Sequence, residues 1–157
     1  MKPRLYLETT IPSYLVARPS RDLRLAADQE ITRRWWEKCR EDYDLFVSEL
    51  VLEEAAQGDA EMAAARLEKL AALPQLGHCP EADALAESIM QRGIIPDIAS
   101  PDAGHIALAA VHGMDFLVTW NCKHIANPRH RRRLEAACQD AGFRCPDICT
   151  PYVLLGN

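Results

Sequence analysis

Acidic and amide side chains follow short apolar segments at several separate places in this sequence. Glu8 comes directly after one such segment, Asp102 opens an expected helix, and Asn121 comes three positions after another segment. Glu53 and Glu54 share a further helix, where adjacent side chains point about 100° apart, so only one of them can face a common cleft. Carboxylate and amide oxygens are ligands that Mg²⁺ and Mn²⁺ prefer. If the segments converge, these residues predict a divalent metal site.

Two of these residues have ordinary structural alternatives. Asp102 follows Ser100 and Pro101 at the start of a helix, where the positive end of the helix dipole favours an anion. An aspartate that only stabilises the first turn would occupy the same position. For Glu8 the alternative is a surface loop, although a carboxylate beside a buried strand is costly without a partner.

Short apolar strands alternate with helices along the chain. We expect strands at 5–7, 44–47 and 116–118, helices at 22–40, 49–57, 60–73, 81–92, 102–112 and 128–141, a helix starting near 11, and a strand that turns into a helix over 148–155. Parallel neighbours need a crossover, which is usually a helix. The pattern therefore predicts an α/β protein, a three-layer α/β/α sandwich with a short parallel central sheet in a single domain over 1–157. Sites in such sheets lie beyond the carboxyl ends of the strands, where these polar residues fall.

The composition excludes several classes of protein. The chain has 157 residues, of which 48% are hydrophobic and 26% charged, so it can bury a core and is not disordered throughout. The net charge of −5 excludes a generally basic nucleic-acid coat. Neither an export signal nor a membrane-spanning stretch is expected, and the six cysteines form no Cys-x-x-Cys motif. We expect a cytoplasmic protein with reduced thiols and no contact with a membrane.

Four segments carry a resemblance to a known family. They read Tyr6-Leu7-Glu8-Thr9-Thr10, Val47-Ser48-Glu49-Leu50-Val51-Leu52-Glu53-Glu54, Pro101-Asp102-Ala103-Gly104-His105-Ile106-Ala107 and Leu117-Val118-Thr119-Trp120-Asn121-Cys122-Lys123-His124-Ile125. In order and spacing they resemble PIN domains, and the chain looks like the VapC-like toxins of type II toxin–antitoxin pairs. The resemblance covers nearly the whole chain, from Leu5 to about Leu155.

This resemblance implies an activity and a set of site residues. The implied activity is Mg²⁺- or Mn²⁺-dependent cleavage of RNA phosphodiester bonds, and the implied partners are an RNA substrate and an antitoxin protein. The acidic quartet of the family, which is catalytic and binds the metal, falls on Glu8, Glu54, Asp102 and Asn121. Two positions depart from the pattern. Glu8 is one methylene longer than the usual aspartate, and Asn121 offers a carbonyl oxygen without a charge, which would weaken metal binding or leave one metal instead of two.

Other polar residues near these motifs have a functional and a structural interpretation. Thr119, His105 and His124 are candidates for orienting a metal ligand or contacting phosphate, and a turn residue or a structural histidine is the alternative. A basic run follows, in which Arg129, Arg131 and Arg132 are candidates for RNA binding. A solvated helix face is the ordinary explanation of such a run.

One helix raises the question of a protein interface. Over 22–40, Leu23, Ala27, Ile31 and Trp35 recur at steps of four and predict one buried stripe. Trp36 lies about 100° away from that stripe on the helix. If exposed, Trp36 would favour an interface, either a homodimer or a groove for an antitoxin peptide.

Three functions follow from these observations. The leading hypothesis is a metal-dependent endoribonuclease that acts as the toxin of a toxin–antitoxin pair. A PIN-like scaffold that binds RNA or protein without cutting it is the alternative, motivated by Glu8 and Asn121. A structure-specific DNA nuclease is chemically similar, but a chain this short lacks room for the added elements of such enzymes.

Overall fold

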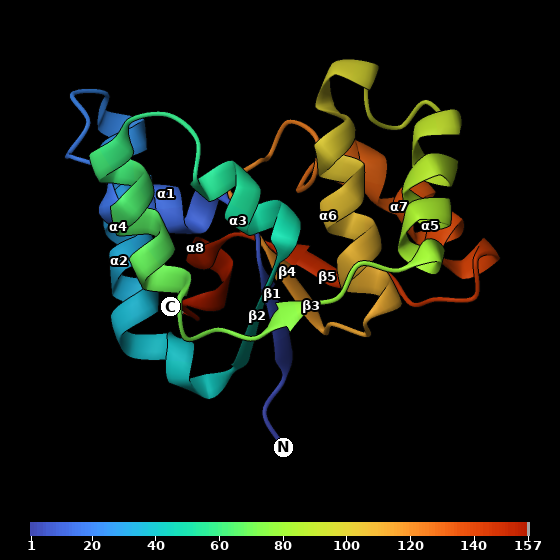
Figure 1. Ribbon diagram of the computed structural model, residues 1–157, viewed down its shortest axis with the longest axis horizontal. Coiled ribbons are helices and arrows are strands. Elements are labelled where there is room, and N and C mark those ends of the chain that lie inside the picture. The colour runs from blue at the N-terminus through green and yellow to red at the C-terminus, as the bar shows by residue number, and fades with distance from the viewer. Residues whose placement is uncertain (157) are drawn as a thin grey trace.

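A parallel sheet of five strands forms the centre of the protein. The computed structural model describes residues 1–156, and its strands lie in the order β3-β2-β1-β4-β5. The strands are β1 (Arg4–Leu7), β2 (Asp44–Ser48), β3 (Gln75–Leu76), β4 (Phe116–Val118) and β5 (Asp147–Cys149). Every neighbouring pair is parallel, with β1 between β2 and β4 at the centre of the sheet. The N-terminus lies near the amino end of β1 (Figure 1).

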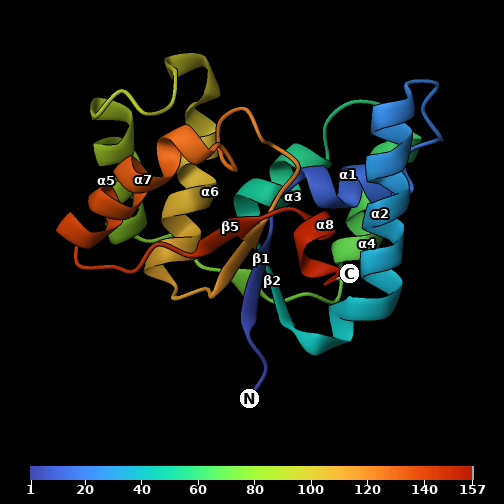
Figure 2. The same ribbon diagram turned by 180° about the vertical axis from the view of Figure 1, so that it is seen from behind.

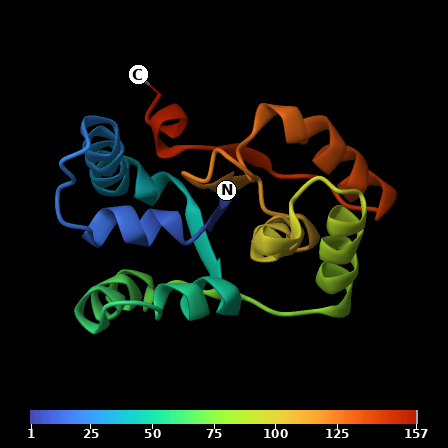
Figure 3. The ribbon, with the colours of Figure 1, turned by 90° about the horizontal axis from the view of Figure 1, so that it is seen from above.

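Helices cover the sheet on both sides. They are α1 (Thr10–Val16), α2 (Leu23–Cys39), α3 (Glu49–Ala55), α4 (Ala60–Leu70), α5 (Pro80–Gln91), α6 (Ser100–Val111), α7 (Pro128–Asp140) and α8 (Pro151–Leu154), with single turns η1 (Arg40–Asp42) and η2 (Asp97–Ala99). Helices α1, α2, α4 and α8 lie on one side, and α5, α6 and α7 lie on the other (Figures 1, 2 and 3). The predicted three-layer α/β/α sandwich with a parallel sheet is confirmed.

The core is built where β1 meets its neighbours. Leu5, Tyr6 and Leu7 are fully buried because β1 has strands on both edges and helices over both faces. Such a central parallel strand must be apolar along its whole length, which explains why alternation is absent there. The first polar residue after it, Glu8, therefore emerges at the carboxyl edge of the sheet.

Two features differ from the sequence prediction: the edge strand β3 was not expected, and helix α4 ends earlier than expected. Helix α4 stops at Leu70 instead of residue 73, and the chain then runs alongside β2, with Val47 N–H bonded to the carbonyl of Pro74. A strand of two residues is too short for any hydropathy period to appear. At the other edge, the predicted strand turning into a helix is present as β5 and α8.

The predicted stripe on α2 is confirmed at Trp35, which is fully buried, and is wrong at Leu23 and Ala27, which are exposed. Leu23 is 87% exposed, whereas the buried positions of α2 are Gln29, Thr32, Trp35 and Trp36. Two of these positions are polar and satisfied by specific bonds, from Ser20 N–H to the Gln29 side chain and from the Trp120 indole to the Thr32 hydroxyl. A pattern that counts only apolar residues cannot find such a face. Because Trp36 is only 9% exposed, it gives no support to a homodimer or an antitoxin interface at this position.

Two further observations concern the chain as a whole. All six cysteines are unpaired within the part of the chain that the structure describes. Over residues 1–156, none of the helices combines the length and the apolar character needed to cross a membrane.

Candidate functional site

Glu8 is the first residue of the site along the chain and lies at the carboxyl end of β1. Its side chain is 5% exposed, and one carboxylate oxygen, Oε1, accepts hydrogen bonds from Thr10 N–H, the Thr10 hydroxyl and the Thr119 hydroxyl at 2.5–3.0 Å. Each of the two hydroxyls also accepts a main-chain N–H, Thr10 that of Trp120 and Thr119 that of Asn121. Because an ionised carboxylate only accepts hydrogen bonds, the hydrogens of both hydroxyls are directed at Glu8.

Glu54 reaches the same place from α3. This helix begins at Ser48, whose hydroxyl accepts Val51 N–H and so caps it immediately after β2. The cap sets the rotation of the helix, which turns Glu54 toward the site. Oε1 of Glu54 contacts the Thr9 hydroxyl and His105 Nε2, both at 2.6 Å. Glu53 is exposed and lines a separate pocket of about 400 Å³ between α3, α5 and α6.

A buried chain of polar groups stands behind Glu54. His105, on α6, is fully buried, and its Nδ1 lies 2.7 Å from the Tyr6 hydroxyl, which lies 2.7 Å from the Ser48 hydroxyl. Burial raises the pKa of Tyr6 far above its ordinary value, so this hydroxyl keeps its hydrogen. A ring with its hydrogen on Nε2 satisfies every group: His105 donates to Glu54, Tyr6 to His105, and Ser48 to Tyr6.

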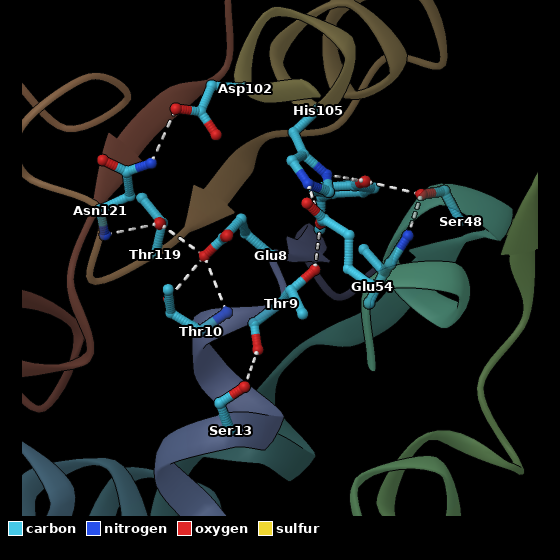
Figure 4. Close-up of polar contacts among 12 residues, drawn as sticks. Glu8, Thr9, Thr10, Ser13, Ser48, Glu54, Asp102, His105, Thr119 and Asn121 are labelled. Atoms are coloured by element: carbon cyan, nitrogen blue, oxygen red, sulfur yellow. Dashed lines mark hydrogen bonds and ion pairs between the residues drawn. The ribbon is translucent and has the colours of Figure 1, made fainter. Parts of the chain in front are cut away.

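Asp102 occupies the first turn of α6, opposite the two glutamates. Its Oδ2 lies 3.0 Å from Asn121 Nδ2 and 2.9 Å from His124 Nδ1. Figure 4 shows the carboxyl groups of Glu8, Glu54 and Asp102 pointing toward one open space. Ligand atoms of Glu8, Glu54 and His105 lie within 4.8 Å of one another, and Asp102 stands outside that tighter group.

The three carboxylates share one feature. Each has a single oxygen held by hydrogen bonds: Oε1 of Glu8, Oε1 of Glu54 and Oδ2 of Asp102. Within residues 1–156 the second oxygen of each makes no hydrogen bond. Three oriented carboxylates with one uncommitted oxygen apiece fit a hard divalent cation, because such ions take oxygen ligands and offset the repulsion between carboxylates.

The surroundings of Glu54 favour its ionised form. Burial of this carboxylate is the largest single effect and acts to raise its pKa, but the hydrogen bond from His105, the charge interaction with His105 and the hydrogen bond from Thr9 together outweigh it. The pKa of Glu54 is therefore held below its ordinary value of 4.5. At neutral pH this side chain is an anion ready to bind a cation.

The remaining predicted residues fall into two groups. Thr119, His105 and His124 each touch a carboxylate of the site directly. The arginines lie on α7, where Arg131 pairs with Glu135 and Asp147, while Arg129 and Arg132 are exposed and make no ion pair within residues 1–156.

Sequence reasoning missed Tyr6, Thr9 and Thr10 as site residues. Tyr6 looked like one more apolar residue of a buried strand, and its hydroxyl acquires a role only through partners 42 and 99 positions away. The sequence did contain a pattern that could have identified the two threonines as site residues, because two adjacent hydroxyl residues follow Glu8 directly. The hydroxyls of such residues commonly bond to groups nearby in the sequence, as the Thr10 hydroxyl does to the Glu8 carboxylate.

Comparison with known proteins gives a likeness of fold. No family model matches the chain, and no curated protein matches it. Among solved structures, the crystal structure of FitAcB from Neisseria gonorrhoeae is similar, with a TM-score of 0.55 and 14% sequence identity. The match covers 94% of this chain and 98% of that one. At this identity the likeness concerns the fold, and the fold is consistent with a PIN-like domain.

Proposed function

We propose that this protein is a metal-dependent endoribonuclease that cleaves RNA phosphodiester bonds. One observation carries the proposal: Glu8, Glu54 and Asp102, from three separate elements, point into one space with one uncommitted oxygen each. The PIN-like fold and the four ordered motifs support it. The metal is Mg²⁺ or Mn²⁺, which the oxygen-rich donor set favours over softer ions.

The residues of the chain have separate tasks in this proposal. The free oxygens of Glu8, Glu54 and Asp102 would hold the ion, while Thr9, Thr10 and Thr119 keep those carboxylates in place. A divalent ion in such a site lowers the pKa of a bound water and neutralises charge on the scissile phosphate. His105 keeps Glu54 turned toward the site. No side chain needs to form a covalent intermediate.

Cleavage of RNA tests the proposal directly. Purified protein incubated with structured RNAs and Mg²⁺ or Mn²⁺ should cut them, and EDTA should stop the reaction. Asp102→Asn should reduce the cleavage rate at least 100-fold, roughly what loss of one strong electrostatic interaction costs a catalyst. Asp97→Asn is the matched control, since Asp97 is exposed one turn before α6. Cleavage that persists in EDTA, or is unchanged in Asp102→Asn, would contradict the mechanism.

A second candidate function is an RNA- or protein-binding scaffold without nuclease activity. It is favoured by Asn121, whose carbonyl oxygen already accepts His124 N–H and is turned away from the metal position. Calorimetric titration with Mn²⁺ separates the two candidates. Binding in the wild type that is lost in Asp102→Ala supports the nuclease, and the absence of binding supports the scaffold.

The proposal includes partners. We propose an antitoxin protein as the natural inhibitor, on the basis of the resemblance to VapC-like toxins. A homodimer stays a prediction, which light scattering on the purified protein would measure. With Trp36 buried, neither rests on an exposed aromatic residue.

A further inference from the structure

Both ends of the Asn121 side chain have a fixed orientation. Its Oδ1 accepts the main-chain N–H of His124 at 3.0 Å, and its Nδ2 lies 3.0 Å from Asp102 Oδ2. Turning the amide over would place its NH₂ group against an N–H and its oxygen against a carboxylate. Because both contacts would then be repulsive, only the observed orientation is compatible with these neighbours.

The loop that carries Asn121 is folded around this residue. Its main-chain oxygen accepts N–H groups of Ile125 and Ala126, and its N–H donates to the Thr119 hydroxyl. The carbonyl of His124 in turn contacts His130 Nδ1, which ties the loop to α7. With every polar atom of Asn121 engaged, its carbonyl oxygen cannot turn to an ion without breaking the bond to His124.

His124 contacts the same oxygen of Asp102 that Asn121 contacts. Its Nδ1 lies 2.9 Å from Asp102 Oδ2, and an ionised carboxylate only accepts, so Nδ1 carries the hydrogen. Asp102 Oδ2 is therefore held by two donors, and Oδ1 is left toward the open space (Figure 4).

We propose that Asn121 is a positioning residue and not a metal ligand: together with His124 it clamps Asp102. This inference rests on the proposed metal site and deepens it. The amide replaces a fourth negative charge by a hydrogen-bond donor, so three carboxylates hold the ion. Asp102 is thereby oriented before any metal arrives, which a fourth carboxylate at position 121 could not achieve without repulsion.

The clamp can be tested in the absence of metal. In EDTA, Asn121→Asp should lower the thermal midpoint by several degrees, because two carboxylates then meet at about 3 Å. Adding Asp102→Asn to that variant should restore part of the loss, since the two hydrogens of the new amide can be donated to the new carboxylate and to His124 Nδ1, with the ring hydrogen of His124 moved to Nε2. Gln139→Glu, an exposed amide-to-acid change on α7, is the control and should leave the midpoint unchanged. An Asn121→Asp protein as stable as the wild type would overturn the clamp.

Metal binding provides the second readout. By calorimetry, Asn121→Ala and His124→Ala should each weaken Mn²⁺ binding about 10-fold, as loss of a group that orients a ligand commonly does. His124→Asn should retain most of the affinity, because its amide can replace the Nδ1–H donor. A crystal structure of the Mn²⁺ complex with Asn121 Oδ1 on the ion would overturn the proposal.

The two proposals fail in different ways. If the wild type binds no Mn²⁺, the proposed function fails, while the metal-free comparison still decides whether Asn121 clamps Asp102. If Mn²⁺ binds and RNA is cut, but Asn121→Asp is fully stable in EDTA, the nuclease stands and the clamp is wrong.

Discussion

Individual hydrogen bonds decide which carboxylate oxygens remain available in this protein. Glu8 is nearly buried, and a carboxylate in that environment is stable as an anion only if donors surround it. Two threonine hydroxyls and one main-chain N–H supply those donors, all to the same oxygen. In the proposed metal site, the orientation of the other oxygen thus depends on residues that would not touch the ion.

Removing one of these donors is the first prediction. Thr119→Val keeps the shape of the side chain but leaves Glu8 with one bond fewer and Asn121 N–H without its acceptor. We expect a loss of about 1–3 kcal/mol in the free energy of unfolding, measured by urea denaturation in EDTA. Thr150→Val is the control, because the Thr150 side chain caps no helix N–H. Equal stability of the two variants would refute the role of Thr119.

The lowered pKa of Glu54 gives a prediction about pH. Because its folded-state pKa lies below the ordinary value of 4.5, Glu54 contributes stability above that pH, and this contribution is lost as the pH falls through the folded-state pKa. Between pH 6 and the acid limit, the wild type should lose stability more steeply than Glu54→Gln. Denaturant titrations in EDTA at several pH values measure the difference. Glu53→Gln, an exposed neighbour, should follow the wild type.

At the scale of elements, apolar segments and helix starts predict the architecture well, because burial and capping are local in sequence. The parallel sheet and the meeting of Glu8, Glu54 and Asp102 beyond its strands follow from those segments. The buried face of α2 could not be predicted in this way, since Gln29 and Thr32 are buried through partners outside the helix. The same limit applies to Asn121: the sequence predicts a ligand there, and the orientation of its amide depends on contacts with Asp102 and His124 that no local pattern contains.

One buried side chain joins three elements at the site through two hydrogen bonds. Tyr6 on β1 bridges Ser48, which starts α3, and His105 on α6. Tyr6→Phe would leave both partners short of a hydrogen bond in a dry environment, so we expect a loss of about 1–3 kcal/mol in unfolding free energy. Tyr14→Phe is the control, because within residues 1–156 the Tyr14 hydroxyl makes no hydrogen bond and its ring stacks on Trp120. A Tyr6→Phe loss no larger than that of the control would show that the buried chain is dispensable.

At the scale of the whole molecule, the net charge of −5 acts against binding of the proposed RNA substrate, which is a polyanion. The positive charge that could attract RNA is densest in one part of the molecule. Helix α7 carries the densest basic run, and the contact of His130 with the His124 carbonyl connects its first turn to the loop that holds Asp102. Arg131 is already engaged by Glu135 and Asp147, and the exposed Arg133 donates to the main-chain carbonyl of Arg92. Within residues 1–156, Arg129 and Arg132 are the exposed arginines of α7 whose side chains make neither an ion pair nor a hydrogen bond.

Those two arginines should therefore contribute to RNA binding. In an Asp102→Asn background with EDTA, which prevents cleavage, Arg129→Ala with Arg132→Ala should weaken RNA binding measured by fluorescence anisotropy. The slope of log affinity against log salt should fall by about 1 for each phosphate contact that is lost. Arg34→Ala with Lys38→Ala, two exposed cations on α2, is the control for net charge. If both pairs of substitutions reduce the affinity and the slope equally, α7 contributes only its charge and does not place RNA at the carboxylates.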